Sequence, residues 1–164
     1  MRYAKIEYNS ISNGPGIRVV FWFQGCSLHC KGCQNPETWD RDSGTPWVSS
    51  DIFKIYNELK KPWVRGLTFS GGHPLEYYNI NSCTHIAEKV KENYPDKDIW
   101  LYTGYLWEDI KDLPIMKYID VIVDGPYIEE QRNISLPYCG SNNQRVIDVK
   151  KSLQNKEVVL YETN

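Results

Sequence analysis

The sequence predicts an α/β fold, either a partial (β/α) barrel or a curved, mainly parallel sheet of about six strands. Apolar runs rich in β-branched and aromatic residues alternate along the chain with segments of helical periodicity. Strands separated by helices form right-handed βαβ units, in which the strands run parallel. About six strands are fewer than the eight that close a (β/α)8 barrel, so the sheet is expected to stay open.

The first half of the chain shows this alternation clearly. Residues 17–23 form a β-branched and aromatic run, which predicts a strand. A stripe of apolar residues at helical spacing predicts a helix over 50–60, and a short apolar run closed by two glycines predicts a strand over 66–69. Helical spacing returns over 80–94, and Pro95 ends this second helix because proline cannot continue it.

The second half repeats the pattern in shorter elements. A strand is predicted over 98–102, followed by a short helix over 107–111 and a strand over 119–123. Two further strands are predicted over 145–149 and 157–161, with a short helix between them. The parallel βαβ units therefore lie in the centre of the chain.

Length and composition limit the class of function. With 164 residues, of which 41% are hydrophobic and 13% aromatic, the chain is expected to form a single domain over 1–164. A formal net charge of -2 argues against a nucleic-acid partner. No apolar run reaches the roughly 18 residues of a membrane span, and the N-terminus lacks the apolar core of a signal peptide. We therefore expect no membrane association and a cytoplasmic location.

Three cysteines follow the first predicted strand. Cys26, Cys30 and Cys33 have the spacing C-x3-C-x2-C on one short loop. Three thiolates can hold three irons of a [4Fe–4S] cluster, whose full ligation takes four cysteines. No fourth cysteine lies nearby, so one iron would stay open to a small molecule, as in reactive metal sites.

Zinc is the alternative ligand for the same three thiols. A tetrahedral zinc site would need a histidine as well, but His29 is adjacent to Cys30 and poorly placed, and His73 could reach it only through the fold. The two isolated cysteines, Cys83 and Cys139, are expected to be buried small apolar residues. The odd number of five cysteines also argues against a disulfide framework.

Glycine-rich loops follow the later strands in the same way. They are Ser70–Pro74, Thr103–Tyr105 and Asp124–Tyr127. Ligands of parallel α/β folds bind at the carboxyl ends of the strands, and glycine lets a ligand approach the backbone closely. Tight turns would explain any one of these loops, but several loops beside a cysteine triad favour one shared site.

The cysteine spacing resembles that of the radical S-adenosylmethionine (radical SAM) enzymes. This resemblance implies a fold of the radical SAM type and two cofactors, a [4Fe–4S] cluster and S-adenosyl-L-methionine. The amino and carboxylate groups of S-adenosylmethionine would occupy the open iron. An electron from the cluster would then release a 5′-deoxyadenosyl radical.

Longer stretches are similar to the activating proteins of anaerobic (class III) ribonucleoside-triphosphate reductase, which are radical SAM activases of glycyl radical enzymes. The matching stretches run in order along nearly the whole chain: Asn13–Val20, Gln24–Cys26, Cys30–Asn35, Ser70–Leu75, Trp100–Tyr105, Asp120–Gly125 and Gly140–Arg145. Gly32 and the short chain distinguish this branch from the formate-lyase activases. The resemblance implies hydrogen abstraction from a glycine of the reductase, which generates its glycyl radical.

The resemblance also implies roles for single residues. Cys26, Cys30 and Cys33 would be the metal ligands, and no side chain would act as a general base. The expected cofactor-binding residues are Gly71, Gly72, His73, Pro74, Thr103, Gly104 and Asp124. The implied partners are the catalytic subunit of the reductase and a flavodoxin-like electron donor, while a homodimer is left open. Asn13 and Arg18 either fix the loop before the first strand or meet the partner protein.

His73 departs from the family, which usually carries Asp or Glu at this position. A neutral imidazole could accept a hydrogen bond from the amine of S-adenosylmethionine, and an imidazolium could not. Because an unperturbed imidazole titrates near pH ~6.5, affinity for the cofactor is expected to fall as the pH drops through that value. The alternative is a loop histidine without ligand contact. Cys139 is a second departure, because many relatives carry arginine there.

Three other functions remain to be separated from this one. They are an activase of a formate-lyase, a small electron carrier and a zinc-stapled interaction module. A ferredoxin-type carrier would add a fourth cysteine, usually before proline, but Asn35 precedes Pro36 here. A zinc module would leave the glycine loops unexplained.

Overall fold

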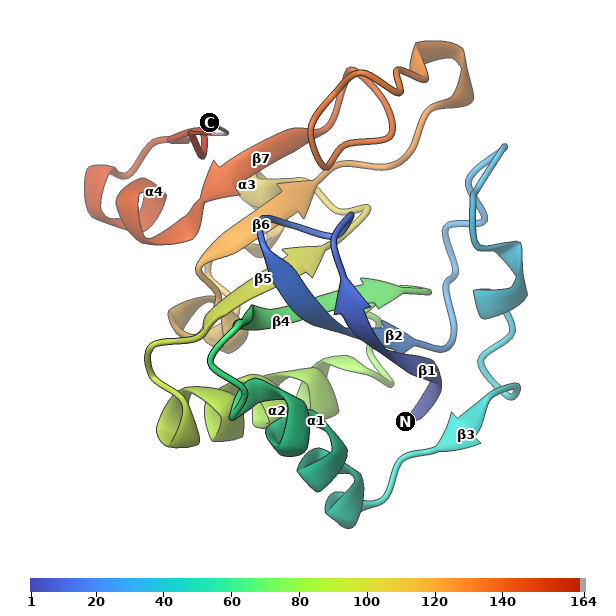
Figure 1. Cartoon of the computed structure of the whole chain (residues 1–164). Helices are drawn as coiled ribbons and strands as arrows, with labels where there is room; N and C mark the ends of the chain where they lie inside the picture. Colours follow the sequence, from blue (N-terminus) through green and yellow to red (C-terminus); the bar gives the residue numbers. More distant parts are fainter. Residues whose placement is uncertain (163–164) are drawn as a thin grey trace.

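The computed structural model describes residues 1–162 and contains one open seven-stranded sheet of order β3-β1-β2-β4-β5-β6-β7 (Figure 1). The strands are β1 (Arg2–Ser10), β2 (Ile17–Phe23), β3 (Thr45–Pro46), β4 (Val64–Gly71), β5 (Asp98–Tyr102), β6 (Val121–Asp124) and β7 (Arg145–Asp148). The central strands β2, β4, β5 and β6 run parallel, and the pairs β1–β2, β1–β3 and β6–β7 are antiparallel. The mixed α/β class, the parallel centre and the open sheet are thus confirmed, with seven strands instead of about six, and a partial barrel of the radical SAM type is not confirmed.

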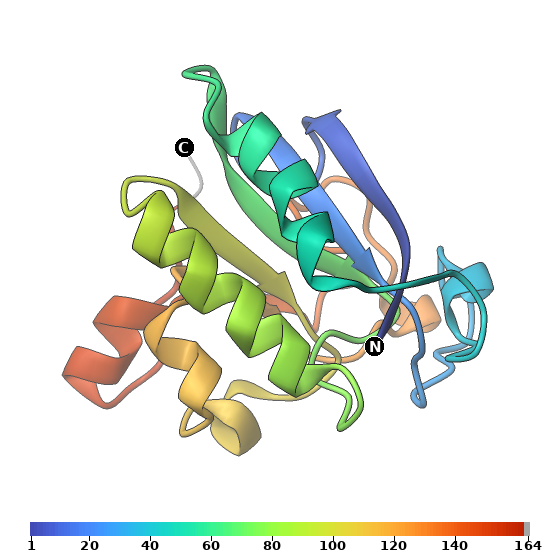
Figure 2. The same cartoon turned by 90° about the horizontal axis from the view of Figure 1, so that it is seen from below.

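Helices cover one face of this sheet. They are α1 (Ile52–Leu59), α2 (Ile80–Asn93), α3 (Trp107–Ile110) and α4 (Val149–Asn155), with 3₁₀ turns at Pro36–Thr38, Ser49–Asp51, Pro114–Lys117 and Glu129–Gln131. Figure 2 shows α1 and α2 lying side by side across the strands. Alternate strand residues such as Phe21, Phe69 and Leu101 are buried with Ile55 and Ile86 of these helices. The helices predicted over 50–60, 80–94 and 107–111 are therefore confirmed, with small differences at their ends.

The opposite face of the sheet buries a second, smaller cluster. Trp100, Val121 and Val123 lie there, and the Trp100 ring packs edge-on against Tyr138 and Tyr161 at 5.1 and 5.2 Å. Tyr138 comes from the loop between β6 and β7 and Tyr161 from the segment after α4, and both cover this cluster.

Two strand predictions were incomplete or wrong. β1 and the two-residue β3 were not predicted, because β1 is mostly half-exposed with charged side chains and β3 is fully exposed, so neither has the apolar run of a buried strand. The strand predicted over 157–161 is wrong, because this segment makes only one isolated bridge, between Ile147 and Leu160. Lys156 just before it has a left-handed backbone (φ 58°) and ends α4.

No helix of the described residues is long and apolar enough to cross a membrane.

The parallel strands place their following loops at one edge of the sheet. In Figure 1 the segment 24–44 and the loop between β6 and β7 both lie on the side to which the arrowheads of β4, β5 and β6 point. The loops after β4 and β5 begin at the same edge. This arrangement brings the cysteine triad and the glycine loops within reach of one another.

Candidate cluster and cofactor site

One cavity of about 590 Å³ opens at this edge of the sheet. Its lining includes all three cysteines of the triad and the residues Gly71, Gly72, His73, Thr103 and Gly104. The lining also contains three aromatic side chains, Trp22, Trp39 and Tyr102. The structure thus brings together eight of the ten residues predicted for the site.

The thiols of the triad are free and half-buried, and backbone N–H groups donate to those of Cys26 and Cys33. Asn35 N–H donates to Cys33 Sγ at 3.4 Å. Burial raises the pKa of the Cys26 thiol, and the backbone N–H groups of Leu28 and His29 oppose that rise by favouring the thiolate. Hydrogen bonds to sulfur are one of the means by which proteins tune iron–sulfur clusters. The donor set therefore fits a thiolate-ligated cluster.

Backbone contacts anchor the cysteine loop. Cys26 N–H donates to Trp39 O at 3.1 Å, and Cys33 N–H donates to Cys30 O at 3.0 Å. Gly32 has a φ of 73°, and a Cβ at this position would collide with the Glu129 carboxylate. The left-handed backbone at Gly32 favours glycine, whereas the Glu129 carboxylate is the end of a flexible side chain that can move aside.

The geometry gives the zinc alternative no support. The His29 ring stacks on Trp39 with centroids 4.6 Å apart. Within residues 1–162, no group of three His, Cys, Asp or Glu side chains is arranged to hold a single metal ion. A [4Fe–4S] cluster makes a different demand, since each thiolate binds its own iron.

Gly72, directly after β4, packs closely against the cysteine loop. Gly72 N–H donates to Phe23 O at 2.8 Å, and His73 N–H donates to Gly25 O at 2.8 Å. A Cβ on Gly72 would lie 2.5 Å from Gly25 O, too close for any side chain. The glycine at this position therefore lets the β4 loop and the cysteine loop pack backbone against backbone.

The His73 imidazole braces two loops. Only 2% of the residue is exposed. Its Nε2 accepts a hydrogen bond from Gly104 N–H at 3.2 Å and lies 2.8 Å from Thr103 Oγ1. Since Nε2 is the acceptor, the neutral ring carries its proton on Nδ1, which has no hydrogen-bond partner among the described residues. The acceptor expected to face the cofactor amine is thus already used by the protein.

Comparison with known proteins decides the family. A family model described as a 4Fe-4S single cluster domain matches residues 12–147. The anaerobic ribonucleoside-triphosphate reductase-activating protein of Enterobacteria phage T4 is 40% identical over 146 residues, which cover 89% of this chain and 93% of that protein. The chain belongs to the family of anaerobic ribonucleoside-triphosphate reductase-activating proteins.

Cellular relatives in this family match over the same extent. The activating protein of Vibrio cholerae is 39% identical over 148 residues, covering 88% of this chain and 96% of its own. That of Escherichia coli K12 is 33% identical over 150 residues, covering 89% and 97%. The resemblance drawn from the sequence motifs is confirmed at the level of the family.

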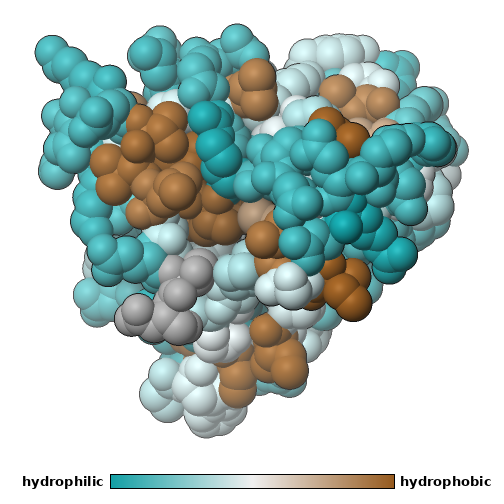
Figure 3. All heavy atoms as spheres, turned by 90° about the horizontal axis from the view of Figure 1, so that it is seen from above, coloured by the Kyte–Doolittle hydropathy of each residue, from teal (hydrophilic) through white to brown (hydrophobic). Residues whose placement is uncertain are grey.

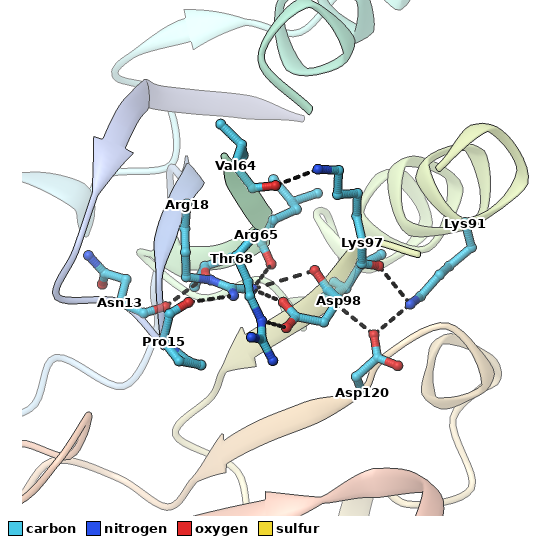
Figure 4. Close-up of polar contacts among 12 residues, drawn as sticks. Asn13, Pro15, Arg18, Val64, Arg65, Thr68, Lys91, Lys97, Asp98 and Asp120 are labelled. Atoms are coloured by element: carbon cyan, nitrogen blue, oxygen red, sulfur yellow. Dashed lines mark hydrogen bonds and ion pairs between the residues drawn. The ribbon is translucent and has the colours of Figure 1, made fainter. Parts of the chain in front are cut away.

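A buried arginine, Arg18, fixes the loop before β2, which contains the start of the matching stretch Asn13–Val20 (Figure 4). Arg18 donates to Thr68 Oγ1 at 2.7 Å and pairs with the Asp98 carboxylate at 2.6 Å. Thr68 in turn donates to Asn13 O at 2.7 Å, and Arg18 donates to Pro15 O at 3.3 Å. Of the two roles left open for Arg18, the structure supports fixing the loop.

The expected titration of His73 is corrected by its burial. Loss of solvent lowers the pKa of the ring to about 4, and the neighbouring Glu76 only partly opposes this. The ring therefore stays neutral through the range in which a change of charge was expected. A dependence of cofactor affinity on His73 protonation near pH ~6.5 is not supported.

A His73→Gln variant should lose less stability on acidification than the wild type. The neutral ring stabilises the fold fully above pH ~6.5, and this contribution is lost as the pH falls toward the folded pKa of about 4. A shift of this size corresponds to about 3 kcal/mol of unfolding free energy. Glutamine keeps an acceptor near Gly104 N–H but does not titrate.

Urea unfolding of the metal-free protein at pH 7 and pH 4 measures this difference. The carboxylates titrate in both proteins, so the comparison isolates position 73. The wild type should lose about 3 kcal/mol more than the variant between these two pH values. Equal losses would show that the ring is not held neutral by burial.

Two predicted cofactor residues do not line the cavity. Pro74 is buried behind it. The Asp124 carboxylate is fully buried, accepts from Trp107 N–H at 2.9 Å and forms an ion pair with Arg145 at 2.5 Å. These partners occupy its oxygens and tie β6 to β7 and α3.

The two isolated cysteines differ in their surroundings. Cys83 is fully buried in the main core, as expected. Cys139 is not a core residue: it is half-buried, lines the cavity and packs near Tyr102 and Tyr138. Burial, with a smaller contribution from Asp124, raises the pKa of its thiol to about 11, so it stays protonated at neutral pH.

Two polar side chains that anchor the cysteine loop, those of Gln24 and Glu76, were not predicted from the sequence. Gln24 donates to Glu37 O and Asp40 O at 3.0 and 2.8 Å. Glu76, buried three residues after His73, accepts from Ser27. A single acid or amide carries no spacing signal, so only the fold reveals these contacts.

Proposed function

We propose that this chain activates an anaerobic ribonucleotide reductase by radical SAM chemistry. Cys26, Cys30 and Cys33 would hold three irons of a [4Fe–4S] cluster, and S-adenosylmethionine would bind the fourth. When bound, these cofactors would supply the chemistry of reductive S-adenosylmethionine cleavage and of hydrogen abstraction from a reductase glycine. The observation that carries the proposal is the one cavity shared by the three thiols and the glycine loops.

The walls of that cavity would bind and orient S-adenosylmethionine. Its volume of about 590 Å³ lies within the usual range for small-molecule sites. Gly71, Gly72, Thr103 and Gly104 would present backbone to the cofactor, and His73 would keep the two loops together. Pro74 and Asp124, behind this wall, would shape it without touching the cofactor.

No residue needs to act as a general base in this scheme. The work of the chain is to hold the cofactors, to orient them and to exclude water and oxygen. Trp22, Trp39 and Tyr102 line the cavity and suit the last task, because their large rings cover apolar area.

The protein partner is proposed from the names of the relatives and from the rim of the cavity. Ile11 and Ile134 are 78% and 87% exposed and adjoin segments that contribute Ser12 and Leu136 to the lining. Apolar surface gathers in patches among polar side chains on the face seen in Figure 3. Such patches are typical of contact sites. We propose the reductase catalytic subunit as the partner and a flavodoxin-like protein as the electron donor, and a homodimer is compatible with this scheme.

The reduced, cluster-loaded protein should cleave S-adenosylmethionine and raise a glycyl radical in an anaerobic ribonucleotide reductase. The measurement is anaerobic incubation with a strong reductant, with 5′-deoxyadenosine and methionine quantified and the glycyl doublet followed by electron paramagnetic resonance. A formate-lyase serves as the competing target. A doublet raised in the formate-lyase and never in the reductase would favour the rival activase, and a colourless protein after reconstitution would favour zinc.

A further inference from the structure

Glu76 is a buried carboxylate for which the scheme above has no use. It is 4% exposed and lies in the turn between β4 and α2. Its Oε1 accepts two hydrogen bonds from Ser27, from the backbone N–H at 2.7 Å and from Oγ at 2.5 Å. Ser27 directly follows Cys26, so Glu76 fixes the chain at the first thiol of the triad.

Glu76 has no lysine or arginine partner in the part of the chain that the structure describes. Within residues 1–162, no Lys or Arg nitrogen lies within 4.0 Å of the Glu76 oxygens. The nearest basic group is His73 Nδ1 at 4.0 Å, on a ring that burial keeps neutral. The Nδ1–H group makes no hydrogen bond among the described residues, so this neutral ring brings no positive charge to the carboxylate.

Glu76 and Cys26 are neighbours, because Glu76 binds Ser27, the residue after Cys26. Burial raises the pKa of Tyr78 to about 12, and both Glu76 and Cys26 add to that rise. The same two groups raise the pKa of Tyr105, after burial as the main cause. Tyr105 packs edge-on against His73 with ring centroids 4.3 Å apart. The pKa values of both tyrosines are therefore raised by the Glu76 carboxylate and the Cys26 thiol as well as by burial.

A buried charge beside a metal cluster acts on its redox equilibrium. Reduction adds one electron to the cluster, and a nearby negative charge in a medium of low dielectric constant disfavours that addition. We propose that Glu76 is a positioning residue that clamps the Cys26–Ser27 segment and, through its buried negative charge, lowers the reduction potential of the cluster. The inference rests on the [4Fe–4S] site proposed above.

This effect has a direct consequence for the proposed reaction. Cleavage of S-adenosylmethionine takes one electron from the reduced cluster, and a lower potential makes that cluster a stronger reductant. The carboxylate would therefore make the cluster harder to reduce and more reactive once reduced. Its hydrogen bonds to Ser27 would keep the thiolate of Cys26 in place in both oxidation states.

The test is a redox titration of the reconstituted protein, followed by visible absorption and electron paramagnetic resonance. Glu76→Gln removes the charge and keeps an acceptor for Ser27. Glu76→Asp keeps the charge on a shorter side chain. The matched control is Glu130→Gln, the same chemical change at a carboxylate that bonds Lys31 of the cysteine loop at 2.7 Å but is 66% exposed.

The Glu76→Gln variant should load the cluster and show a midpoint potential more positive than that of the wild type. The Asp variant should lie between the two, and Glu130→Gln should match the wild type because solvent screens its charge. A Gln variant with the wild-type potential would overturn the inference, and so would one that folds but takes up no cluster. Failure of the wild type itself to take up a [4Fe–4S] cluster would instead overturn the proposed function.

Discussion

Replacing Cys26, Cys30 or Cys33 singly with alanine is expected to abolish the [4Fe–4S] spectrum and its shift on addition of S-adenosylmethionine. Each thiolate would hold a separate iron, so removing one thiol leaves one iron without its protein ligand. Activity should fall to background with the cluster, so this is the largest effect that a single substitution can have. The measurement is iron and sulfide content with visible absorption after anaerobic reconstitution.

Cys139→Ala is the most demanding control for this result. Cys139 lines the same cavity as the triad, and Cys83 lies buried in the main core. If Cys139 only lies near the cluster and is not a ligand, the Cys139→Ala variant should keep the [4Fe–4S] spectrum. Loss of the cluster in Cys139→Ala with retention in Cys30→Ala would refute the assignment of the ligands.

Arg18→Met should cost about 3–5 kcal/mol of unfolding free energy, the usual penalty for breaking a buried ion pair from one side. The guanidinium is completely buried, and its removal takes the donor from the Leu67 carbonyl and the ion-pair partner from Asp98 Oδ1, while Arg65 still pairs with Asp98 Oδ2. The loop that carries Asn13 would also lose the Thr68 contact that Arg18 orients. Denaturant unfolding of the metal-free protein measures the loss.

Arg65→Met provides the matched control. Arg65 pairs with the same Asp98 at 3.0 Å, but its side chain is 55% exposed. Exposed ion pairs contribute up to about 1 kcal/mol, so this variant should remain close to the wild type. Similar losses for the two variants would show that burial of Arg18 does not determine its contribution.

The elements that the sequence predicted best are those buried on both faces. β2 and β5 carry apolar residues on the helix-covered face and residues such as Trp100 on the other, so each appears as an unbroken run. β1 escaped prediction because a half-exposed strand carries charged residues at intermediate positions. The segment 157–161 has the apolar residues of a strand, but it contributes only one bridge to the sheet.

The site divides in a similar way. A fixed spacing revealed the cysteine triad, and strand ends followed by glycine revealed the loops that share its cavity. Burial could not be read from the sequence, so His73 was expected to titrate near its ordinary pKa. Asp124 was expected to face a ligand, because its ion-pair partner Arg145 is distant in the sequence and could not be predicted from it.

The backbone contact between the cysteine loop and the β4 loop makes them one mechanical unit. His73 N–H bonds Gly25 O, and Gly72 leaves no room between its own α-carbon and that carbonyl. A displacement of either loop is therefore transmitted to the other without any side chain as intermediary. A larger side chain at Gly72 would therefore displace Cys26, which directly follows Gly25. This coupling would act between positions more than forty residues apart in the sequence.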